Sequence, residues 1–272
     1  MRKSFILGLG AQKAGTTWLY EYLKASPKSA MGHLKEYHVW DAIHIPSCRN
    51  YLLEGSTSEL PLKKQIRRQL QMSETAYFEY FESLLQNEDK EITADISPSY
   101  SGLSRDVLMR IRRGFEEKGI DCKVVFLMRD PVDRCWSFAR MLQTRRDRRV
   151  AQAKTLEEFL LKYAKTTAAS IRTRYEQILP EIDATFSSDS TYIGFYETMF
   201  GPQSITELSH FVGIEPDPDF VEEKFNVSSD GARLSEDAKV TLARHFRTTY
   251  EFAARRYPET TTLWRNAKYA MS

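Results

Sequence analysis

Two glycines with the spacing of a phosphate-binding loop are the most informative feature of the sequence. Gly10 and Gly15 lie within the segment Gly-Ala-Gln-Lys-Ala-Gly-Thr-Thr-Trp, residues 10–18, which directly follows the apolar run Ser4–Leu9. Glycines let the backbone wrap closely around an anion, and free N–H groups at the start of a following helix supply a favourable field. The spacing therefore predicts a phosphate-binding loop between a strand and a helix, rather than an empty turn.

The position of the lysine distinguishes this loop from the loops of nucleotide kinases. In kinase loops Lys and then Ser or Thr follow the second glycine, whereas here Thr16 and Thr17 follow it. The lysine, Lys13, lies inside the loop instead. The loop is expected to bind phosphate, but with its positive charge placed differently.

A second anion site is predicted after another apolar run, Lys123–Met128. Arg129 follows this run, at the strand end where open α/β sheets bind their ligands. Asp130 is a favourable N-cap residue and Pro131 a favourable first helical residue, so a helix is expected to begin here. Ser137 then lies two turns into the helix and is expected to project to the side of Arg129.

These two motifs resemble the nucleotide-binding segments of sulfotransferases that use 3′-phosphoadenosine 5′-phosphosulfate (PAPS). The first loop is similar to the family's 5′-phosphosulfate-binding loop, and the resemblance implies that Lys13 neutralises charge developing on the leaving phosphate. Trp18 is expected either near the nucleotide or in the core. The nucleotide-binding residues implied in this loop are Gln12, Lys13, Ala14, Gly15, Thr16, Thr17 and Trp18.

The same resemblance assigns Arg129 and Ser137 to the nucleotide's 3′-phosphate. Two separated phosphate sites favour PAPS over ATP, whose phosphates form a single chain. Near the C-terminus, the segment Asn226–Arg233 stands where the family has a glycine-containing loop that closes over the nucleotide, and Arg233 is expected to reach the 3′-phosphate.

The segment Lys35–Asp41 supplies two candidates for the general base. It resembles the Lys-Glu-x-His-Phe-Phe-Asp segment of carbohydrate sulfotransferases of the heparan-sulfate type and their bacterial relatives, in which the glutamate takes the hydroxyl proton of the acceptor. This implies Glu36 as the base. His38 is the rival, because small-molecule sulfotransferases use a histidine and a neutral imidazole needs little tuning near pH 7. The alternative is that Glu36 and His38 simply hydrogen-bond in a loop.

Three other features bear on the acceptor and on metals. Asp95–Tyr100 resembles the family's Lys-Thr-Pro/Ser-Pro-x-Tyr segment, with Ile96 where the carbohydrate enzymes have a lysine. The basic cluster Arg145–Arg149, near Arg140, either faces an anionic acceptor such as a sulfated glycan or, the favoured interpretation, forms a solvated helix face. No metal is expected, because the spacings of His33, His38 and His44 match no common zinc pattern.

The elements that must position these residues indicate an α/β protein. Short apolar runs at Ser4–Leu9, Ile92–Asp95, Lys123–Met128 and Thr191–Phe195 alternate with helical patterns, which predicts a P-loop-like three-layer fold with a central, mainly parallel sheet flanked by helices. The longest helix is expected over Ser235–Tyr257. Residues 59–86 and 145–180 lack strand patterns and are expected to be helical.

Composition limits the class of protein. The 272 residues are 42% hydrophobic with a formal net charge of +2, which favours one domain over residues 1–272 and does not indicate a nucleic-acid partner. Three widely spaced cysteines fit free thiols in a reducing compartment, and no apolar stretch approaches the roughly 20 residues that span a bilayer. A cytoplasmic protein is expected, and its oligomeric state stays open.

The sequence therefore predicts a PAPS-dependent sulfotransferase that moves a sulfuryl group, by in-line transfer, to the hydroxyl of a carbohydrate or small molecule. One alternative is a P-loop nucleotide-dependent kinase, in which Val124–Asp130 would be a strand followed by a magnesium-holding aspartate. The other is a non-catalytic protein of the same fold that binds a nucleotide or glycan.

Overall fold

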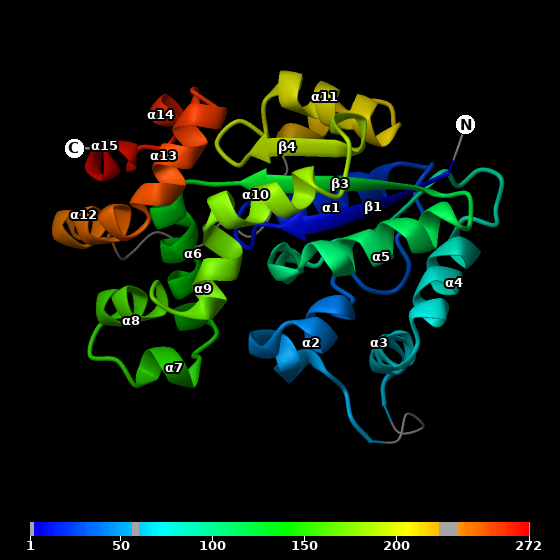
Figure 1. Cartoon of the computed structure of the whole chain (residues 1–272), viewed down its shortest axis with the longest axis horizontal. Helices are drawn as coiled ribbons and strands as arrows, with labels where there is room; N and C mark the ends of the chain where they lie inside the picture. The colour runs from blue at the N-terminus through cyan, green and yellow to red at the C-terminus, as the bar shows by residue number, and fades with distance from the viewer. Residues whose placement is uncertain (1–2, 56–59, 223–232, 272) are drawn as a thin grey trace.

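The computed structural model describes residues 3–55, 60–222 and 233–271. Within these ranges four parallel strands form one sheet in the order β2-β1-β3-β4 (Figure 1). The prediction of an α/β fold with a parallel central sheet is confirmed. The strands are β1 (Ser4–Gly10), β2 (Ile92–Asp95), β3 (Asp121–Met128) and β4 (Thr191–Phe195).

The central strands are almost continuously apolar because helices cover both faces of the sheet. Every residue of β1 is buried, and Ser4 is in register with Ile92 on one side and Asp121 on the other. A parallel sheet buried on both faces requires this kind of sequence rather than an alternating one. The β1–β3 register shifts between Gly8 and Gly10, just before the first loop.

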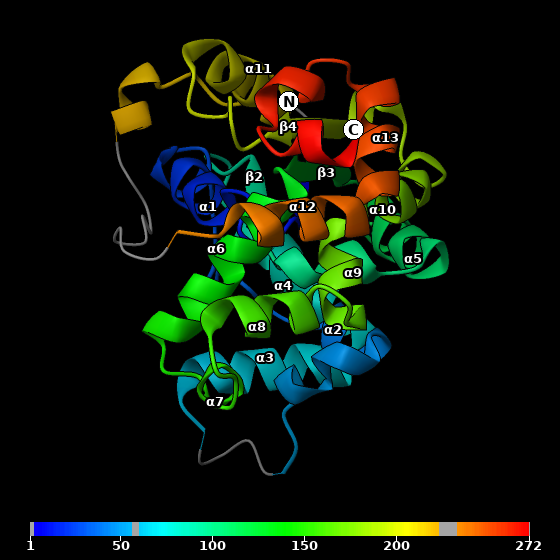
Figure 2. The same ribbon diagram turned by 90° about the vertical axis from the view of Figure 1, so that its left-hand side faces the viewer.

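Helices lie on the two faces and beside the two edge strands (Figures 1 and 2). Helix α1 lies on one face, and α5 and α10 lie on the other. The aromatic residues Tyr77, Phe78 and Phe81 of α4 are buried in the core. These helices are α1 (Thr16–Ala25), α4 (Glu74–Leu84), α5 (Arg105–Glu116), α10 (Tyr175–Asp183) and, beside β4, α11 (Pro202–Val212).

Two groups of helices lie below the sheet in Figure 1. One comes from the connection between β1 and β2, and consists of α2 (Trp40–His44), the 3-10 turn η1 (Pro46–Tyr51) and α3 (Leu62–Met72). The other follows β3, and consists of α6 (Pro131–Thr144), α7 (Arg148–Ala151), α8 (Leu156–Tyr163) and α9 (Thr167–Thr173). Shorter 3-10 turns are η2 (Pro98–Gly102), η3 (Ser188–Ser190) and η4 (Pro218–Glu222).

The C-terminal region corrects the prediction of a single helix over Ser235–Tyr257. Two helices, α12 (Glu236–His245) and α13 (Arg247–Arg256), are separated at Phe246, which has φ of −99° and ψ of 20° and is fully buried. The break lets α12 pack against α6 and α15 (Ala267–Ala270) while α13 packs against α10 and α14 (Thr260–Leu263). Tertiary packing thus overrides a locally favourable continuation of the helix.

In the described ranges, no helix has both the length and the apolar character needed to cross a bilayer. The three cysteines are buried free thiols.

Candidate functional site

The first loop, residues 10–15, connects β1 to α1 in a conformation that only glycine suits at both ends. Gly10 has φ of +131°, and a Cβ there would lie 2.7 Å from the Pro98 carbonyl oxygen. Gly15 has φ of +91°, and a Cβ there would collide with the Met199 side chain. The backbone of the loop is therefore held between two neighbouring segments, and side chains at these positions would displace it.

The start of α1 carries no negative charge from its own sequence. Gly15 is the N-cap without a side-chain cap bond, and the first turn contains no acidic residue. The first four N–H groups of a helix have no partner within the helix, and together with the helix dipole they attract an anion. The side chain of Trp18 contributes to the core, because the residue is 2% exposed and its ring stacks on Tyr22 with 4.9 Å between centroids.

Three cations surround this helix start. Arg129 donates from Nη1 to the Lys13 carbonyl at 2.9 Å, and its guanidinium lies 4.0 Å from the ring centroid of Tyr196. Lys35 donates from Nζ to Thr17 Oγ1 at 2.9 Å. Burial lowers the pKa of Lys13 to about 8, with further contributions from nearby positive charges, chiefly Arg129. Such a concentration of like charge indicates a place for a polyanion.

The second predicted anion site follows β3 as expected. Asp130 caps α6 by accepting hydrogen bonds from the backbone N–H groups of Val132 and Asp133, and Pro131 occupies the first turn. Ser137 lies half-buried on α6. Arg233 is exposed, and residues 226–232 of the predicted closing loop lie outside the described residues. The assignment of Arg129, Ser137 and Arg233 to a 3′-phosphate stays a prediction.

Glu36, His38 and Asp41 form a hydrogen-bonded chain beside the first loop. His38 Nδ1 lies 2.7 Å from Asp41 Oδ2, and His38 Nε2 lies 3.1 Å from Glu36 Oε2. Lys35 Nζ lies 3.0 Å from Glu36 Oε1. Although burial lowers it, the hydrogen bonds that His38 donates to the carboxylates of Asp41 and Glu36 raise its pKa to about 9. Burial raises the pKa of Glu36, but the hydrogen bonds and positive charges of His38 and Lys35 outweigh it and lower the pKa to about 2. His38 is therefore a cation and Glu36 a carboxylate at neutral pH.

A buried network below this chain fixes the backbone that carries it. Asp95 accepts hydrogen bonds from the hydroxyls of Ser97, at 2.6 Å, and Tyr100, at 2.8 Å. Those hydroxyls in turn accept from the backbone N–H groups of His38 and Val39. His38 has φ of +51°, a strained conformation for a non-glycine residue that its surroundings hold in place. Burial raises the pKa of Asp95 to about 6.

The structure shows what Ile96 does at the position where the related carbohydrate enzymes have a lysine. Ile96 is fully buried and packs against Gly8, where a Cβ would come within 2.6 Å of Ile96 Cδ1. Its side chain therefore belongs to the core.

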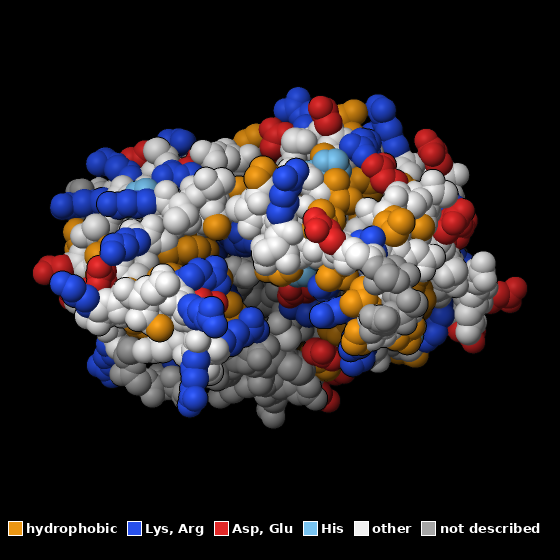
Figure 3. Space-filling model, turned by 90° about the horizontal axis from the view of Figure 1, so that it is seen from below, with side chains coloured by type: hydrophobic (Ala, Val, Ile, Leu, Met, Phe, Trp, Pro, Cys, Tyr) orange, Lys and Arg blue, Asp and Glu red, His pale blue; other side chains and the backbone are white. Residues whose placement is uncertain are grey.

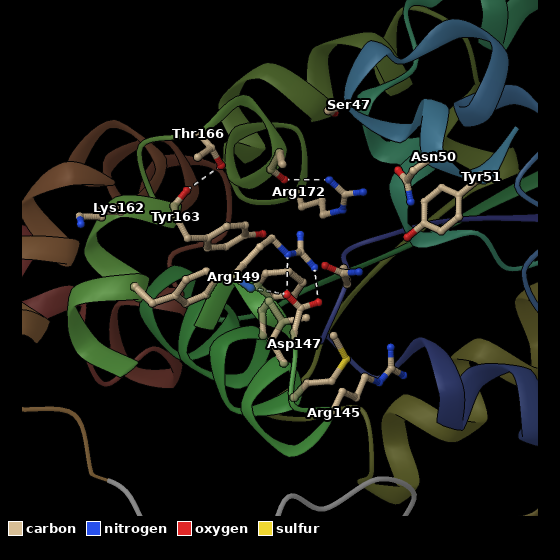
Figure 4. Close-up of a pocket in the computed structure, with 16 residues that line it drawn as sticks. Ser47, Asn50, Tyr51, Arg145, Asp147, Arg149, Lys162, Tyr163, Thr166 and Arg172 are labelled. Atoms are coloured by element: carbon tan, nitrogen blue, oxygen red, sulfur yellow. Dashed lines mark hydrogen bonds and ion pairs between the residues drawn. The ribbon is translucent and has the colours of Figure 1, made fainter. Parts of the chain in front are cut away.

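A cavity of about 440 Å³ adjoins the first loop at Gln12 (Figure 4). Its walls come from η1, the end of α6, α7, α8 and α9, so it lies between the two groups of helices below the sheet. Figure 3 shows this face, with a central hollow and Lys and Arg side chains gathered along its left rim. The residues lining the cavity include Ser47, Asn50 and Tyr51 from η1 and Thr166, Ala168 and Arg172 from α9 and its N-cap.

The basic cluster Arg145–Arg149 is not one solvated helix face. Helix α6 ends at Thr144, Arg146 has φ of +52°, and Asp147 caps the short helix α7. This turn directs Arg145, Asp147 and Arg149 into the lining of the cavity while the arginines keep their exposure.

A sequence model of the sulfotransferase domain matches residues 3–230. The chain belongs to the sulfotransferase domain family. This confirms the prediction of a sulfotransferase, and the kinase alternative gains no support.

The fold agrees with solved sulfotransferase structures. The chain is similar to a sulfotransferase from Alicyclobacillus acidocaldarius with a TM-score of 0.62 and 18% identity, over 97% of this chain and 99% of that one. The sulfotransferase domain of the Synechococcus PCC 7002 olefin synthase matches with a TM-score of 0.44 and 17% identity, covering 88% and 92%. A sulfotransferase domain from the curacin biosynthetic pathway matches with a TM-score of 0.49 and 14% identity, over 85% of this chain and 81% of that one. No sequence among curated proteins matches.

Sequence reasoning missed several residues of this sulfotransferase that lie close to the site. Arg134 is fully buried and donates to the Gln12 carbonyl at 3.4 Å, which supports the first loop from below. Tyr51 stacks on His38 with 3.7 Å between ring centroids. Arg134 follows Arg129 by five residues at the predicted start of a helix, and this position could have indicated it. No local pattern marks Tyr51 or Arg172. Over residues 3–55, 60–222 and 233–271, no group of three or more His, Cys, Asp or Glu side chains is arranged to hold a metal ion.

Proposed function

We propose that this sulfotransferase moves a sulfuryl group from PAPS to an acceptor hydroxyl, with Glu36 as the general base. One observation carries the proposal: the ammonium of Lys35 bridges the start of α1 and the candidate base, lying 2.9 Å from Thr17 Oγ1 and 3.0 Å from Glu36 Oε1. The phosphate-binding loop and a carboxylate are thus one side chain apart, which is the proximity that a transfer between two bound substrates needs.

The residues around α1 fit a nucleotide with phosphates at two positions. The N–H groups of the helix start, with Lys13 and Lys35, suit the 5′-phosphosulfate, and Arg129, Ser137 and Arg233 suit the 3′-phosphate. PAPS supplies the sulfuryl group already activated by its bond to phosphate. Lys13 stabilises the charge left on that phosphate as the bond to sulfur breaks.

The protonation states favour Glu36 over His38 as the base. A histidine with a pKa of about 9 already carries its proton at neutral pH and cannot accept another. Glu36 is ionised and accepts the hydroxyl proton while the acceptor oxygen forms its bond to sulfur. His38 is then a positioning residue, because its two ring nitrogens join Glu36 to the buried Asp41.

A transfer assay with labelled PAPS against phenols, steroids, lipids and glycans tests this function. Glu36→Gln is expected to lower kcat by about 10²- to 10⁴-fold, because it removes the base while keeping the shape of the side chain. Its affinity for 3′,5′-bisphosphoadenosine should stay within a few-fold of wild type. Lys13→Ala should lose both transfer and nucleotide affinity, whereas Lys24→Ala, a change at an exposed lysine of α1, should lose neither.

The same measurements separate the alternatives. A larger loss of kcat in His38→Gln than in Glu36→Gln would transfer the role of base to His38. Thermal stabilisation by ATP with magnesium but none by 3′,5′-bisphosphoadenosine would contradict PAPS as the donor. Inactivity of the wild type with every hydroxyl acceptor, despite tight nucleotide binding, would instead indicate a binding protein.

A further inference from the structure

Arg172 places a nearly buried positive charge at the wall of the cavity without a carboxylate to compensate it. The residue is 6% exposed. Its guanidinium donates to the Ala168 carbonyl at 2.8 Å and to Cys48 Sγ at 3.4 Å, and its Nε is buried without a hydrogen-bond partner in the described ranges. Burying a guanidinium without an anionic partner costs free energy, so the position suits an anion that arrives from outside the chain.

Arg145, Arg149 and Lys162 also line the cavity, but all three are exposed, and two of them have a carboxylate partner. Arg149 forms two hydrogen bonds of 2.8 Å with the carboxylate of Asp147. Lys162 donates to Glu158 at 2.8 Å. Figure 4 shows the guanidinium of Arg149 turned to Asp147, whereas that of Arg172 is turned toward Asn50 and Tyr51 across the cavity. Among the described cations that line the cavity, Arg172 is thus the buried one, and no ion pair joins it to a carboxylate of the described residues.

One wall of the cavity is apolar and aromatic. Phe138 and Tyr163 stack with 4.4 Å between ring centroids, and Met141, Leu142 and Phe159 extend this wall. A cavity of about 440 Å³ is within the range that holds a small organic molecule. An apolar wall beside one buried guanidinium favours a ligand with an apolar body and an anionic group.

The cavity leads to both halves of the proposed reaction centre. Gln12, in its lining, belongs to the first loop and precedes Lys13. Tyr51, also in its lining, stacks on His38, which holds Glu36. A ligand seated in the cavity would therefore contact Gln12, the neighbour of Lys13, and Tyr51, whose ring stacks on His38.

We propose that the acceptor is a small hydroxyl compound with an apolar body and an anionic group, and that Arg172 binds the anion. The wall of Phe138, Phe159 and Tyr163 takes the apolar body, which leaves the hydroxyl for Glu36. This inference rests on the proposed function, since it names the acceptor class of the same site. The shared chemistry is an anion that accepts two parallel N–H bonds from a guanidinium, and carboxylate, phosphate ester and sulfate ester all qualify.

Matched acceptors test the charge directly. 3-(4-Hydroxyphenyl)propanoate and its carboxamide differ in charge but hardly in shape, and 4-hydroxyphenyl phosphate and 4-hydroxyphenyl sulfate replace the carboxylate by the two esters. The wild type should have a KM at least about tenfold lower for the propanoate than for the carboxamide, since charge-assisted hydrogen bonds are about twice as strong as neutral ones. Comparison of KM among the three anions identifies the preferred one.

Arg172→Gln should abolish this discrimination, bringing the ratio of the two KM values close to one. Its affinity for 3′,5′-bisphosphoadenosine should remain unchanged. Arg172→Lys, which keeps the charge but not the planar fork, should retain part of the ratio and serves if the glutamine variant does not fold. Arg149→Gln is the matched control and should retain the ratio, because Asp147 already compensates that arginine.

Calorimetric binding of the propanoate in the presence of 3′,5′-bisphosphoadenosine gives a readout independent of turnover. Equal affinity for propanoate and carboxamide, or a preference that survives in folded Arg172→Gln, would overturn the proposal. So would a sulfated oligosaccharide that is a far better acceptor and insensitive to Arg172. Failure of the proposed function has another signature, which is no nucleotide binding or full activity in Glu36→Gln.

Discussion

Lys13 is a lysine whose charge depends on what is bound beside it. In the ligand-free protein its pKa is lowered to about 8, first by burial and then by Arg129, Arg145, Lys35 and Arg140. A bound phosphate would favour the charged form and raise the pKa again. Binding of the nucleotide above pH 8 must therefore take up a proton.

This linkage predicts how nucleotide affinity depends on pH. The Kd for 3′,5′-bisphosphoadenosine should change little between pH 7 and 7.5 and should rise by up to about tenfold per unit above pH 8. Calorimetry in buffers of different ionisation enthalpy should show the uptake of protons at pH 8.5. Lys13→Gln should bind more weakly, with that rise removed. A wild-type Kd that is flat from pH 7 to 9.5 would place Lys13 away from the phosphates.

Residue types and spacing were enough to select Lys13, Gly15 and Glu36 as candidates, because the segments that carry them are contiguous in sequence. Arg172 could not be found in this way. Its importance comes from burial against Cys48 and from facing a cavity whose opposite wall, formed by η1 and Gln12, is more than 100 positions away in the chain. An uncompensated charge is visible only when the partners of every neighbouring cation are known.

At the scale of elements, the first loop depends on Gly15 for two reasons that can be separated. Gly15 and Gly213 both have φ of +91°, but a Cβ at Gly15 would collide with Met199 whereas nothing lies within 4 Å of one at Gly213. Gly213→Ala should therefore lose only the left-handed backbone strain, about 1–2 kcal/mol of unfolding free energy. Gly15→Ala should lower the free energy of unfolding by a further ~1–3 kcal/mol, because its Cβ overpacks the contact with Met199.

Urea unfolding and nucleotide titration of the two variants check this difference. Gly15→Ala should also lose most of its affinity for 3′,5′-bisphosphoadenosine, because the displaced loop no longer presents its N–H groups. Gly213→Ala should bind like wild type, since it lies at the end of α11. Equal losses of stability and unaltered binding in both variants would mean that the contact with Met199 is easily relieved.

The elements themselves were predicted unevenly. Strands β2 and β4 begin and end where the sequence indicated, because each is a short apolar run. The start of α6 was predicted from Asp130 and Pro131 for a local reason, the cap. The break at Phe246 was missed, because it is decided by what α12 and α13 each pack against.

On the scale of the whole molecule, the sheet gathers like charges at one end. Lys13 and Lys35 lie between β1 and β2, Arg129 follows β3, and Arg145 follows α6. The positive charges of Lys35, Arg129 and Arg145 nevertheless all lower the pKa of Lys13. Parallel strands bring the ends of distant segments to one edge of the sheet, so cations that are far apart in the sequence can form one anion site. The ligand-free protein then bears repulsion that the nucleotide relieves.

This repulsion predicts a reversal of stability between two forms of the protein. Without ligand at low salt, Lys13→Gln should unfold at a higher temperature than wild type, because it removes one of the mutually repelling charges. The gap should narrow as NaCl rises toward 0.3 M, since the screening length falls below about 8 Å above physiological ionic strength. Saturating 3′,5′-bisphosphoadenosine should reverse the order of the two unfolding temperatures, because only wild type gains the full binding free energy.

Calorimetric scans of both proteins, with and without the nucleotide, compare these unfolding temperatures. Lys24→Gln, a change at an exposed lysine, is the control and should follow wild type throughout. A Lys13→Gln protein that is less stable than wild type without ligand would show that Lys13 supports the loop structurally and that the cations are not held in mutual repulsion.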